Sequence, residues 1–240
     1  KGRYKPRIEK RQQKLIGKVS FVRHFLEPGE TILLVTTGHS PPTVLEKMGI
    51  GWLFLYLKRS LLIFTDRRIF HVPTTSIYGY RHSIAQIPYG ACESIQMKRG
   101  SMKVHYKNGE QSETFFSLSG KEKKKIRELL KTVSLEDAKS SVAARSHLCP
   151  QCAATLYNSI PACGKCGLTF KTRNTATLLA ILIPGGGYFY LRQPFLGVAT
   201  ALLEISAIAL IVASVTHPHV GMSSNLMWMG LGVLMLLLIK

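Results

Sequence analysis

The stretch LGVATALLEISAIALIVASV, residues 196–215, decides the architecture of this chain because its twenty residues include a single charge, Glu204. An α-helix of about twenty predominantly apolar residues can cross the hydrocarbon core of a bilayer. Similar apolar stretches lie on both sides of it, and a soluble domain cannot easily bury three of them. The sequence therefore predicts a multi-pass membrane protein. The predicted transmembrane region covers residues 174–240, with spans at 175–191, 196–215 and 220–239.

Glu204 stands alone inside its predicted span. A carboxylate at that depth is costly and usually faces protein or water. Its helical stripe also holds Gly197, Ala201 and Ile208, and small residues four apart let another helix approach closely. We therefore expect a protonated Glu204 that shares a hydrogen bond with a neighbouring helix, either of this chain or of a protein partner or homo-oligomer. The alternative is an ion or proton site in a channel, transporter or envelope complex.

The turn before the middle span carries a resemblance. PGGGYFYLRQPFLG, residues 184–197, resembles a Pro-Gly-rich membrane hairpin of bacterial proteins, in which the turn joins two short spans. Leu191 stands where that hairpin usually has a glycine before its basic residue. The residues that match are Pro184, Gly185, Gly187, Tyr190, Arg192 and Gly197.

The charge of the chain is concentrated ahead of the predicted spans. The net charge is +19, and residues before Asn174 hold 30 of the 32 Lys and Arg and 12 of the 13 Asp and Glu, an excess of +18. Beside membrane spans this excess favours anionic membrane lipids over nucleic acid, because each Lys or Arg gains about 1 kcal/mol near an anionic leaflet. Lys171 and Arg173 immediately precede the first span, so the positive-inside rule places the N-terminal domains in the cytosol, at the inner membrane.

Residues 1–29 form a predicted basic arm or helix. Eight Lys and Arg up to Lys18 are accompanied by one acidic residue, Glu9. Either this helix lies on anionic lipid, or it is a solvated basic helix that belongs to a larger fold. Because the chain begins without methionine and ends where a span ends, we expect a piece of a longer protein. A thin apolar stripe at helical spacing comprises Ile8, Leu15, Ile16 and Val19.

Residues 30–134 carry a strand-rich pattern that ends in one helix. Asn108-Gly109 predicts a tight hairpin, because both residues tolerate positive φ. Ser119 and Glu122 predict a capping box, followed by a helix with one buried face. The pattern predicts an α+β fold, a small β-barrel capped by a C-terminal helix. The expected strands are 31–37, 60–72 (one strand bent at 65–67), 84–97 (one strand or two), 102–106 and 113–118, and the helix face is Ile126, Leu129, Leu130 and Val133.

LLIFTDRRIFHV (61–72) and SIAQIPYGACESIQMKRGSMKVHYKNGEQSETFFSLSG (83–120), followed by a helix, resemble bacterial PH-like and GRAM-type domains. Such domains bind lipid head groups or protein partners and are not enzymes, so the resemblance implies a scaffold. It favours a structural turn at Asp66. Residues 43–57 depart from the resemblance, because they are longer and more apolar than the corresponding loop of such domains. They form either a core strand or a loop that dips aromatic side chains into the membrane interface. The resemblance leaves a candidate basic rim for a lipid or partner, comprising Lys58, Arg59, Arg67 and Arg68.

After a small polar linker, 135–147, residues 148–173 contain the motifs CPQC and CGKC. Two CxxC pairs in a reducing cytosol indicate a metal site, whereas redox pairs or an extracellular disulfide cluster are disfavoured there. The segment resembles a small bacterial zinc ribbon. Four thiolates close a tetrahedral zinc site and leave no position open for catalysis. The predicted zinc ligands are Cys149, Cys152, Cys163 and Cys166, and Cys92 stands apart.

The sequence contains no phosphate loop, GxSxG or HExxH motif. We therefore expect a non-enzymatic membrane protein that recruits or senses a lipid or protein partner at the inner face. One alternative is the channel, transporter or envelope subunit that uses Glu204. The other is a membrane-tethered nucleic-acid binder, although the ribbon carries too few cations and aromatic residues for that role.

Overall fold

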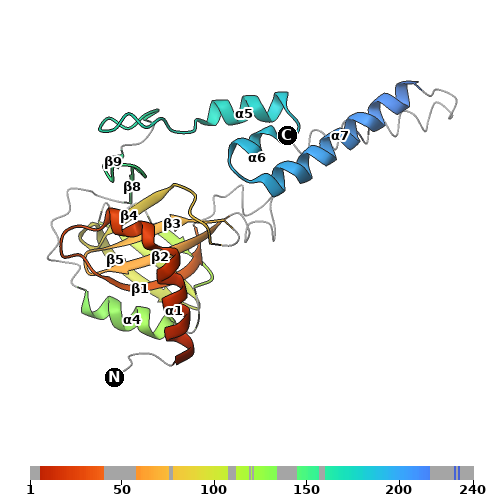
Figure 1. The fold of residues 1–240 in the computed structure, drawn as a ribbon. Coiled ribbons are helices and arrows are strands. Elements are labelled where there is room, and N and C mark those ends of the chain that lie inside the picture. Colours follow the sequence, from red (N-terminus) through yellow and green to blue (C-terminus); the bar gives the residue numbers. More distant parts are fainter. Residues whose placement is uncertain are drawn as a thin grey trace. The chain divides into compact units, whose positions relative to one another are not determined.

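The computed structural model shows an α+β protein whose chain divides into two compact units, Lys1–Leu168 and Thr169–Lys240 (Figure 1). The structure describes residues 6–40, 58–75, 78–107, 112–118, 120, 122–133, 145–156, 160–216, 230 and 232. The expected core strand or dipping loop at 43–57 lies outside these residues, as does the span expected at 220–239 except for two glycines.

The first unit is built on two antiparallel sheets. One has six strands in the order β1-β2-β3-β4-β8-β9, and the other has three in the order β5-β6-β7. A 3₁₀ helix, η2 (Tyr89–Ala91), joins the two sheets between β4 and β5, and another, η1 (Ser20–Phe25), precedes β1. The strands are β1 (Ile32–His39), β2 (Arg59–Thr65), β3 (Arg68–Pro73), β4 (Ile84–Pro88), β5 (Cys92–Lys98), β6 (Ser101–Tyr106), β7 (Ser112–Phe115), β8 (Ser146–Leu148) and β9 (Thr155–Leu156).

Strand β2 is central and is covered on both faces, which explains its unbroken apolar run. Leu62 and Phe64 join a core with β6, β7 and the helix α4 (Lys123–Thr132). Leu61 and Ile63 join a second core with η1 and the helix α1 (Pro6–Lys18). The six-stranded sheet is therefore the middle layer of the unit.

The expected barrel is not closed. Between the two sheets the described residues show one isolated bridge, His39 to Phe116, with backbone N···O distances of 2.9 and 3.1 Å. Strand β5 does not pair with β4 and so does not extend the sheet, because β8 pairs with the remaining edge of β4 through Ile84 and Leu148. The two sheets thus pack against each other as separate layers.

The segment expected as one bent strand, 60–72, is instead a hairpin in which Ile63 of β2 pairs with Phe70 of β3. Thr65 makes the turn, because its Oγ1 accepts hydrogen bonds from the backbone N–H groups of Arg67 (3.2 Å) and Arg68 (3.0 Å). The turn expected at Asp66 is thus made by Thr65, and Asp66 instead accepts a hydrogen bond from the backbone N–H of Thr31, just before β1, at 2.9 Å.

The capping box expected before α4 is wrong for Glu122. This residue precedes the helix, but its side chain makes no cap hydrogen bond. The buried carboxylate instead accepts hydrogen bonds from Thr36 Oγ1 (2.6 Å) and Gln12 Nε2 (2.9 Å). It therefore ties α4 to β1 and to the N-terminal helix, and Ser119 lies outside the described residues.

The basic helix α1 belongs to the folded unit. This agrees with the alternative of a solvated basic helix that is part of a larger fold. Leu15 and Val19 are buried, whereas Ile16 is 44% exposed. Gln12 binds the outer edge of β1 twice, because Nε2 donates to the Val35 carbonyl (2.7 Å) and Oε1 accepts from the Val35 N–H (3.1 Å). The helix is thereby fixed to the sheet by one face.

The second unit begins with two short helices, α5 (Arg173–Leu182) and α6 (Gly186–Tyr190). The residues expected as one span, 175–191, therefore do not form a single helix, because the chain reverses between α5 and α6 at Pro184, whose ring disfavours helix continuation, and at Gly185, whose φ is 67°. The long helix α7 (Pro194–Thr216) follows. It contains the one stretch of the described residues, Pro194–Ala213, that is long and apolar enough to cross a membrane.

His71 of β3 is a buried histidine in the core between the two sheets. Its Nε2 lies 2.8 Å from Ser40 Oγ. Burial, and then the positive charges of Arg145, His147 and Lys58, lower its pKa from 6.5 to about 3. The folded state thus binds fewer protons than the unfolded state between these two pH values.

We predict that His71 makes the first unit sensitive to acid. The stability that the neutral His71 contributes is complete above pH 6.5 and is lost as the pH falls toward 3. At pH 5 the loss in the free energy of unfolding is about 2 kcal/mol. Urea unfolding of the full chain in detergent, followed by circular dichroism at pH 8 and pH 5, measures it. The difference between the two pH values should shrink by that amount in His71→Leu. Equal pH dependence in both proteins would contradict the prediction.

Candidate functional site

Four cysteines converge in the first unit. Their sulfur atoms all lie within 4.8 Å of one another. Cys149 and Cys166 are 3.5 Å apart, and Cys152 and Cys163 are 3.6 Å apart, measured between Sγ atoms. Each close pair joins one motif to the other, and no disulfide links them. The sequence prediction that these four residues form one cluster is confirmed.

The two motifs fold into the same backbone turn. In the first, Ala153 N–H donates to the Cys149 carbonyl (3.0 Å), and in the second, Gly167 N–H donates to the Cys163 carbonyl (2.8 Å). Both closing residues have positive φ, 57° at Ala153 and 71° at Gly167. The turn directs backbone N–H groups at the sulfur atoms. Hydrogen bonds from the N–H groups of Cys166 and Lys165 lower the pKa of Cys163 from 9.0 to about 6.

The donor set fits a metal ion. Four thiolates this close repel one another. The Leu168 N–H lowers the pKa of Cys166, but desolvation and then the neighbouring thiols raise it to about 12. A central cation removes this conflict. Zinc–sulfur bonds of about 2.3 Å in a tetrahedron place sulfur atoms about 3.8 Å apart, close to the distances found here. The four cysteines can therefore hold one metal ion.

The fifth cysteine has no part in this cluster. Cys92 starts β5 and is fully buried in the core between the sheets. Burial raises the pKa of its thiol to about 12, and its Sγ donates to the Pro88 carbonyl at 3.4 Å. A neutral, buried thiol of this kind is an unreactive core residue.

The cysteine cluster is continuous with the six-stranded sheet. Strand β8 ends one residue before Cys149 and pairs with β4. On the other side, His24 Nε2 donates to the Gln151 carbonyl at 2.9 Å, and Leu148 is buried in the same core as η1. Sequence reasoning missed this connection because Ser146 and His147 were placed in the linker, and a three-residue strand leaves no readable alternation.

The structure separates the four residues of the candidate basic rim. Arg68 is only 8% exposed, because its guanidinium binds Glu30 with both Nε (3.0 Å) and Nη2 (2.6 Å). Burial alone would raise the pKa of Glu30, but hydrogen bonds from Arg68, from the Glu27 N–H and from Thr65 lower it. Arg68 is thus an internal structural residue and does not belong to a surface rim.

The other three rim residues lie nearer the surface. Arg67 pairs with Glu27 at 2.8 Å, and the Arg59 guanidinium lies 5.6 Å from the centre of the Tyr78 ring. Lys58 immediately precedes β2 and is half-buried. A lipid or partner-binding role for these three residues stays a prediction.

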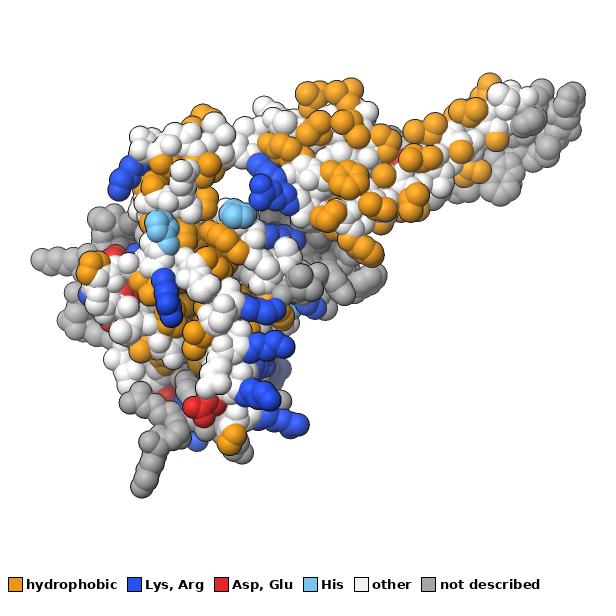
Figure 2. Space-filling view, in the orientation of Figure 1, with side chains coloured by type: hydrophobic (Ala, Val, Ile, Leu, Met, Phe, Trp, Pro, Cys, Tyr) orange, Lys and Arg blue, Asp and Glu red, His pale blue; other side chains and the backbone are white. Residues whose placement is uncertain are grey.

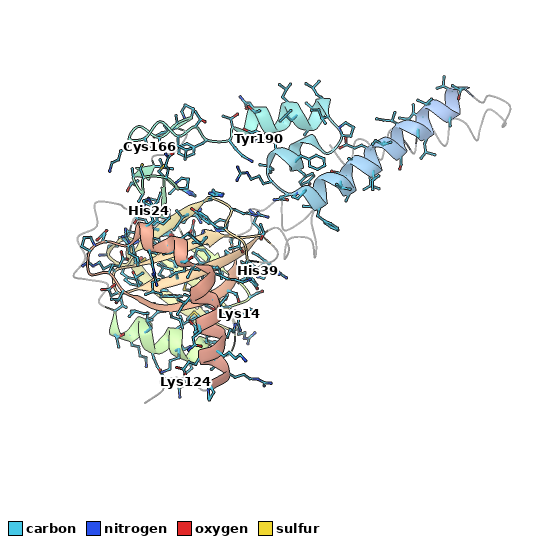
Figure 3. The ribbon with its side chains drawn as sticks, viewed as in Figure 1. Lys14, His24, His39, Lys124, Cys166 and Tyr190 are labelled. Carbon is cyan, nitrogen blue, oxygen red and sulfur yellow. The ribbon has the colours of Figure 1, made fainter. Side chains whose placement is uncertain are left out.

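A more continuous basic surface lies on α1, and sequence reasoning did not define it as a face. Figure 2 shows Lys and Arg side chains in a column over the region where Figure 1 draws this helix. Lys14 is labelled on α1 in Figure 3. The exposed cations that form this cationic ridge are Arg7, Lys10, Lys14 and Lys18.

Glu204 lies on the buried side of α7. Its exposed fraction is 4%, and that of Ala207 is 0%. The expected stripe is right for Gly197 and Ala201, which pack closely against the turn at Gly185. It is wrong for Ile208, which is 46% exposed. A Cβ on Gly232 would lie 3.0 Å from the Ala207 carbonyl, so Gly232 lies close to α7 about one turn beyond Glu204.

Comparison of the chain with protein-family models found no match, and neither did comparison with curated proteins.

We predict that the metal depends on Cys149 and not on Cys92, although both cysteines are buried. The alanine variants of the two residues remove the same atom. Metal analysis of purified protein should find one bound ion per chain in the wild type and in Cys92→Ala, and loss of the ion in Cys149→Ala. Retention of the full metal content in Cys149→Ala would refute the four-cysteine centre.

We predict that Glu204 is a packing residue. Glu204→Gln keeps its shape and hydrogen-bonding capacity and should assemble with unchanged thermal stability in detergent. Glu204→Leu should lose about 1 kcal/mol, the modest worth of such a hydrogen bond in membranes. A proton or cation flux in vesicles that the wild type supports and Glu204→Gln abolishes, with normal assembly, would contradict this prediction.

Proposed function

We propose that this chain is a non-enzymatic membrane protein whose cytosolic domain presents the cationic ridge of α1 to the anionic surface of the inner membrane, and recruits or senses a partner there. The observation that carries the proposal is a row of cations along one face of a helix whose opposite face is fixed to the sheet. Rigid placement matters because an ordered row loses little side-chain and backbone freedom on binding.

The order of elements supports the resemblance to PH-like and GRAM-type domains. Four antiparallel strands, β1 to β4, are followed by the three-stranded sheet and then by α4. The helix lays Ile126 into the core between the sheets. This layout suits a binding module, because the interior is filled by apolar side chains and the outer faces remain for a lipid head group or a protein.

Zinc is the metal that suits the cysteine cluster best. A four-thiolate set has soft ligands and tetrahedral spacing, which zinc prefers. With all four positions taken by protein, the ion has a structural role. Its effect would be to hold the turn that follows β8, and thereby to keep β8 paired with β4.

The membrane location rests on α7 and on the charges at the start of α5. Apolar side chains cover the exposed surface of α7, including Leu202 (62% exposed) and Ile205 (54%). Lys171 and Arg173 lie immediately before the apolar residues of α5. By the positive-inside rule these charges favour a cytosolic first unit in a multi-pass protein of the inner membrane.

We predict that reversing charges on the ridge loosens the domain from anionic lipid. The full chain, with a fluorescent amino acid at the exposed Gln13, is reconstituted in vesicles that carry an acceptor dye on their head groups. Energy transfer should be higher in phosphatidylglycerol than in phosphatidylcholine, and should fall with salt because exposed charges are screened within about 8 Å. Lys10→Glu with Lys14→Glu should abolish the difference.

The matched control is Lys124→Glu with Lys131→Glu on α4, which changes the net charge equally at exposed positions. It should retain the preference for phosphatidylglycerol. Equal loss in both pairs would mean that net charge and not the ridge is responsible, and no lipid preference in the wild type would reject the electrostatic mechanism.

A further inference from the structure

The second unit contains a short helical hairpin whose two arms are held together along their length. Helix α6 runs back along α5, because a Cβ on Gly186 would lie 2.4 Å from the Leu179 carbonyl and one on Gly187 would lie 2.9 Å from the Ala180 Cβ. Glycine at both positions permits this approach. The chain therefore goes out along α5 and returns along α6.

The two ends of this hairpin meet at one polar base. Lys171 Nζ donates to the Tyr190 carbonyl and lies 4.9 Å from the centre of the Tyr190 ring. The Thr172 N–H donates to the Tyr190 hydroxyl at 3.3 Å. Tyr190 is labelled in Figure 3. Because α5 starts and α6 ends at these contacts, the chain leaves the hairpin at the level where it entered.

The depth of the hairpin is set by its contact with α7. At the turn, a Cβ on Gly185 would lie 2.1 Å from the Gly197 carbonyl and 3.2 Å from the Ala201 Cβ. These residues lie about 5 and 10 Å along α7 from Pro194, at 1.5 Å per residue, whereas the whole helix is about 35 Å long. If the two arms of the hairpin each crossed the whole bilayer, the turn would lie near the opposite end of α7, beside Thr216.

The surface of the hairpin matches one leaflet of a bilayer. Large apolar side chains near the turn are exposed, whereas the base holds cations and tyrosines suited to head groups. Leu191 (47%) and Phe195 (84%) are also exposed at the base, but the cations lie only there, so the charge separation from base to turn fits a monolayer with an anionic surface. The exposed apolar residues are Leu178 (56%), Ile181 (63%), Leu182 (67%) and Ile183 (50%), and the exposed cations of the base are Lys171, Arg173 and Arg192.

We propose that α5 and α6 form a re-entrant hairpin that inserts into a single leaflet, with acyl chains around the turn and anionic head groups at the base. Helix α7 then starts on the same side of the membrane as α5 and crosses to the opposite side. This inference rests on the proposed membrane location of the second unit. It reverses the direction of α7 relative to the three-span topology that the sequence predicts.

Cysteine labelling of the full chain tests the proposal. Asn174→Cys, Phe195→Cys and Thr216→Cys each introduce one thiol at an exposed position. Sealed membranes are treated with an impermeant polyethylene-glycol maleimide before and after permeabilisation, and the added mass is scored on a gel. The parent chain gives the background from the native cysteines. The proposal expects residues 174 and 195 to be labelled from the same side, and residue 216 only from the other.

The outcomes separate this inference from the proposed function. Labelling of residues 174 and 195 from opposite sides would restore a complete first span and overturn the hairpin. Labelling of all three from one side would overturn it too, and would show that α7 does not cross. Residues 174 and 195 together on the outer side, with 216 inside, would support the hairpin while rejecting the cytosolic placement of the first unit.

Discussion

The first unit depends on a buried chain of hydrogen bonds centred on Arg68. Its guanidinium binds the carboxylate of Glu30, just before β1, and also donates to the side-chain oxygen of Gln86 on β4. Gln86 Nε2 in turn donates to Ser146 Oγ at 3.1 Å, at the start of β8. Polar groups taken out of water must keep their partners or cost several kcal/mol. These hydrogen bonds therefore fix both the start of the sheet and strand β8, which leads into the cysteine cluster.

The cysteine cluster is consequently a part of the domain architecture. A separate ribbon on a linker could turn freely, whereas here Cys149 follows a paired strand and Gln151 is bound by His24. An ion bound by the four thiolates would close the loop between the two CxxC turns and immobilise β8 and β9. Metal binding and completion of the six-stranded sheet are then one equilibrium, as expected where binding energy is also folding energy.

The sequence predicted best those features that depend on local pattern. Fixed spacing identified the four cysteines, and composition identified the stretch that forms α7. The sequence could not reveal contacts between distant segments. Arg68 was expected on the surface, but its guanidinium is buried against Glu30. Glu122 was expected to cap its own helix, but its carboxylate binds Gln12 of α1 and Thr36 of β1. The single helix expected at 175–191 is absent for a different reason. Hydropathy measures how apolar residues 175–191 are, whereas the packing of Gly185 on Gly197 determines that they turn back.

The outer strands of the six-stranded sheet have a consequence for crowded conditions. An unpaired strand edge invites pairing with another chain, the first step in many aggregation reactions. Here Gln12 occupies both backbone groups of Val35 on β1, and the opposite edge is β9, whose two residues offer almost no template. The six-stranded sheets of many copies held at high local density are therefore poor templates for joining edge to edge.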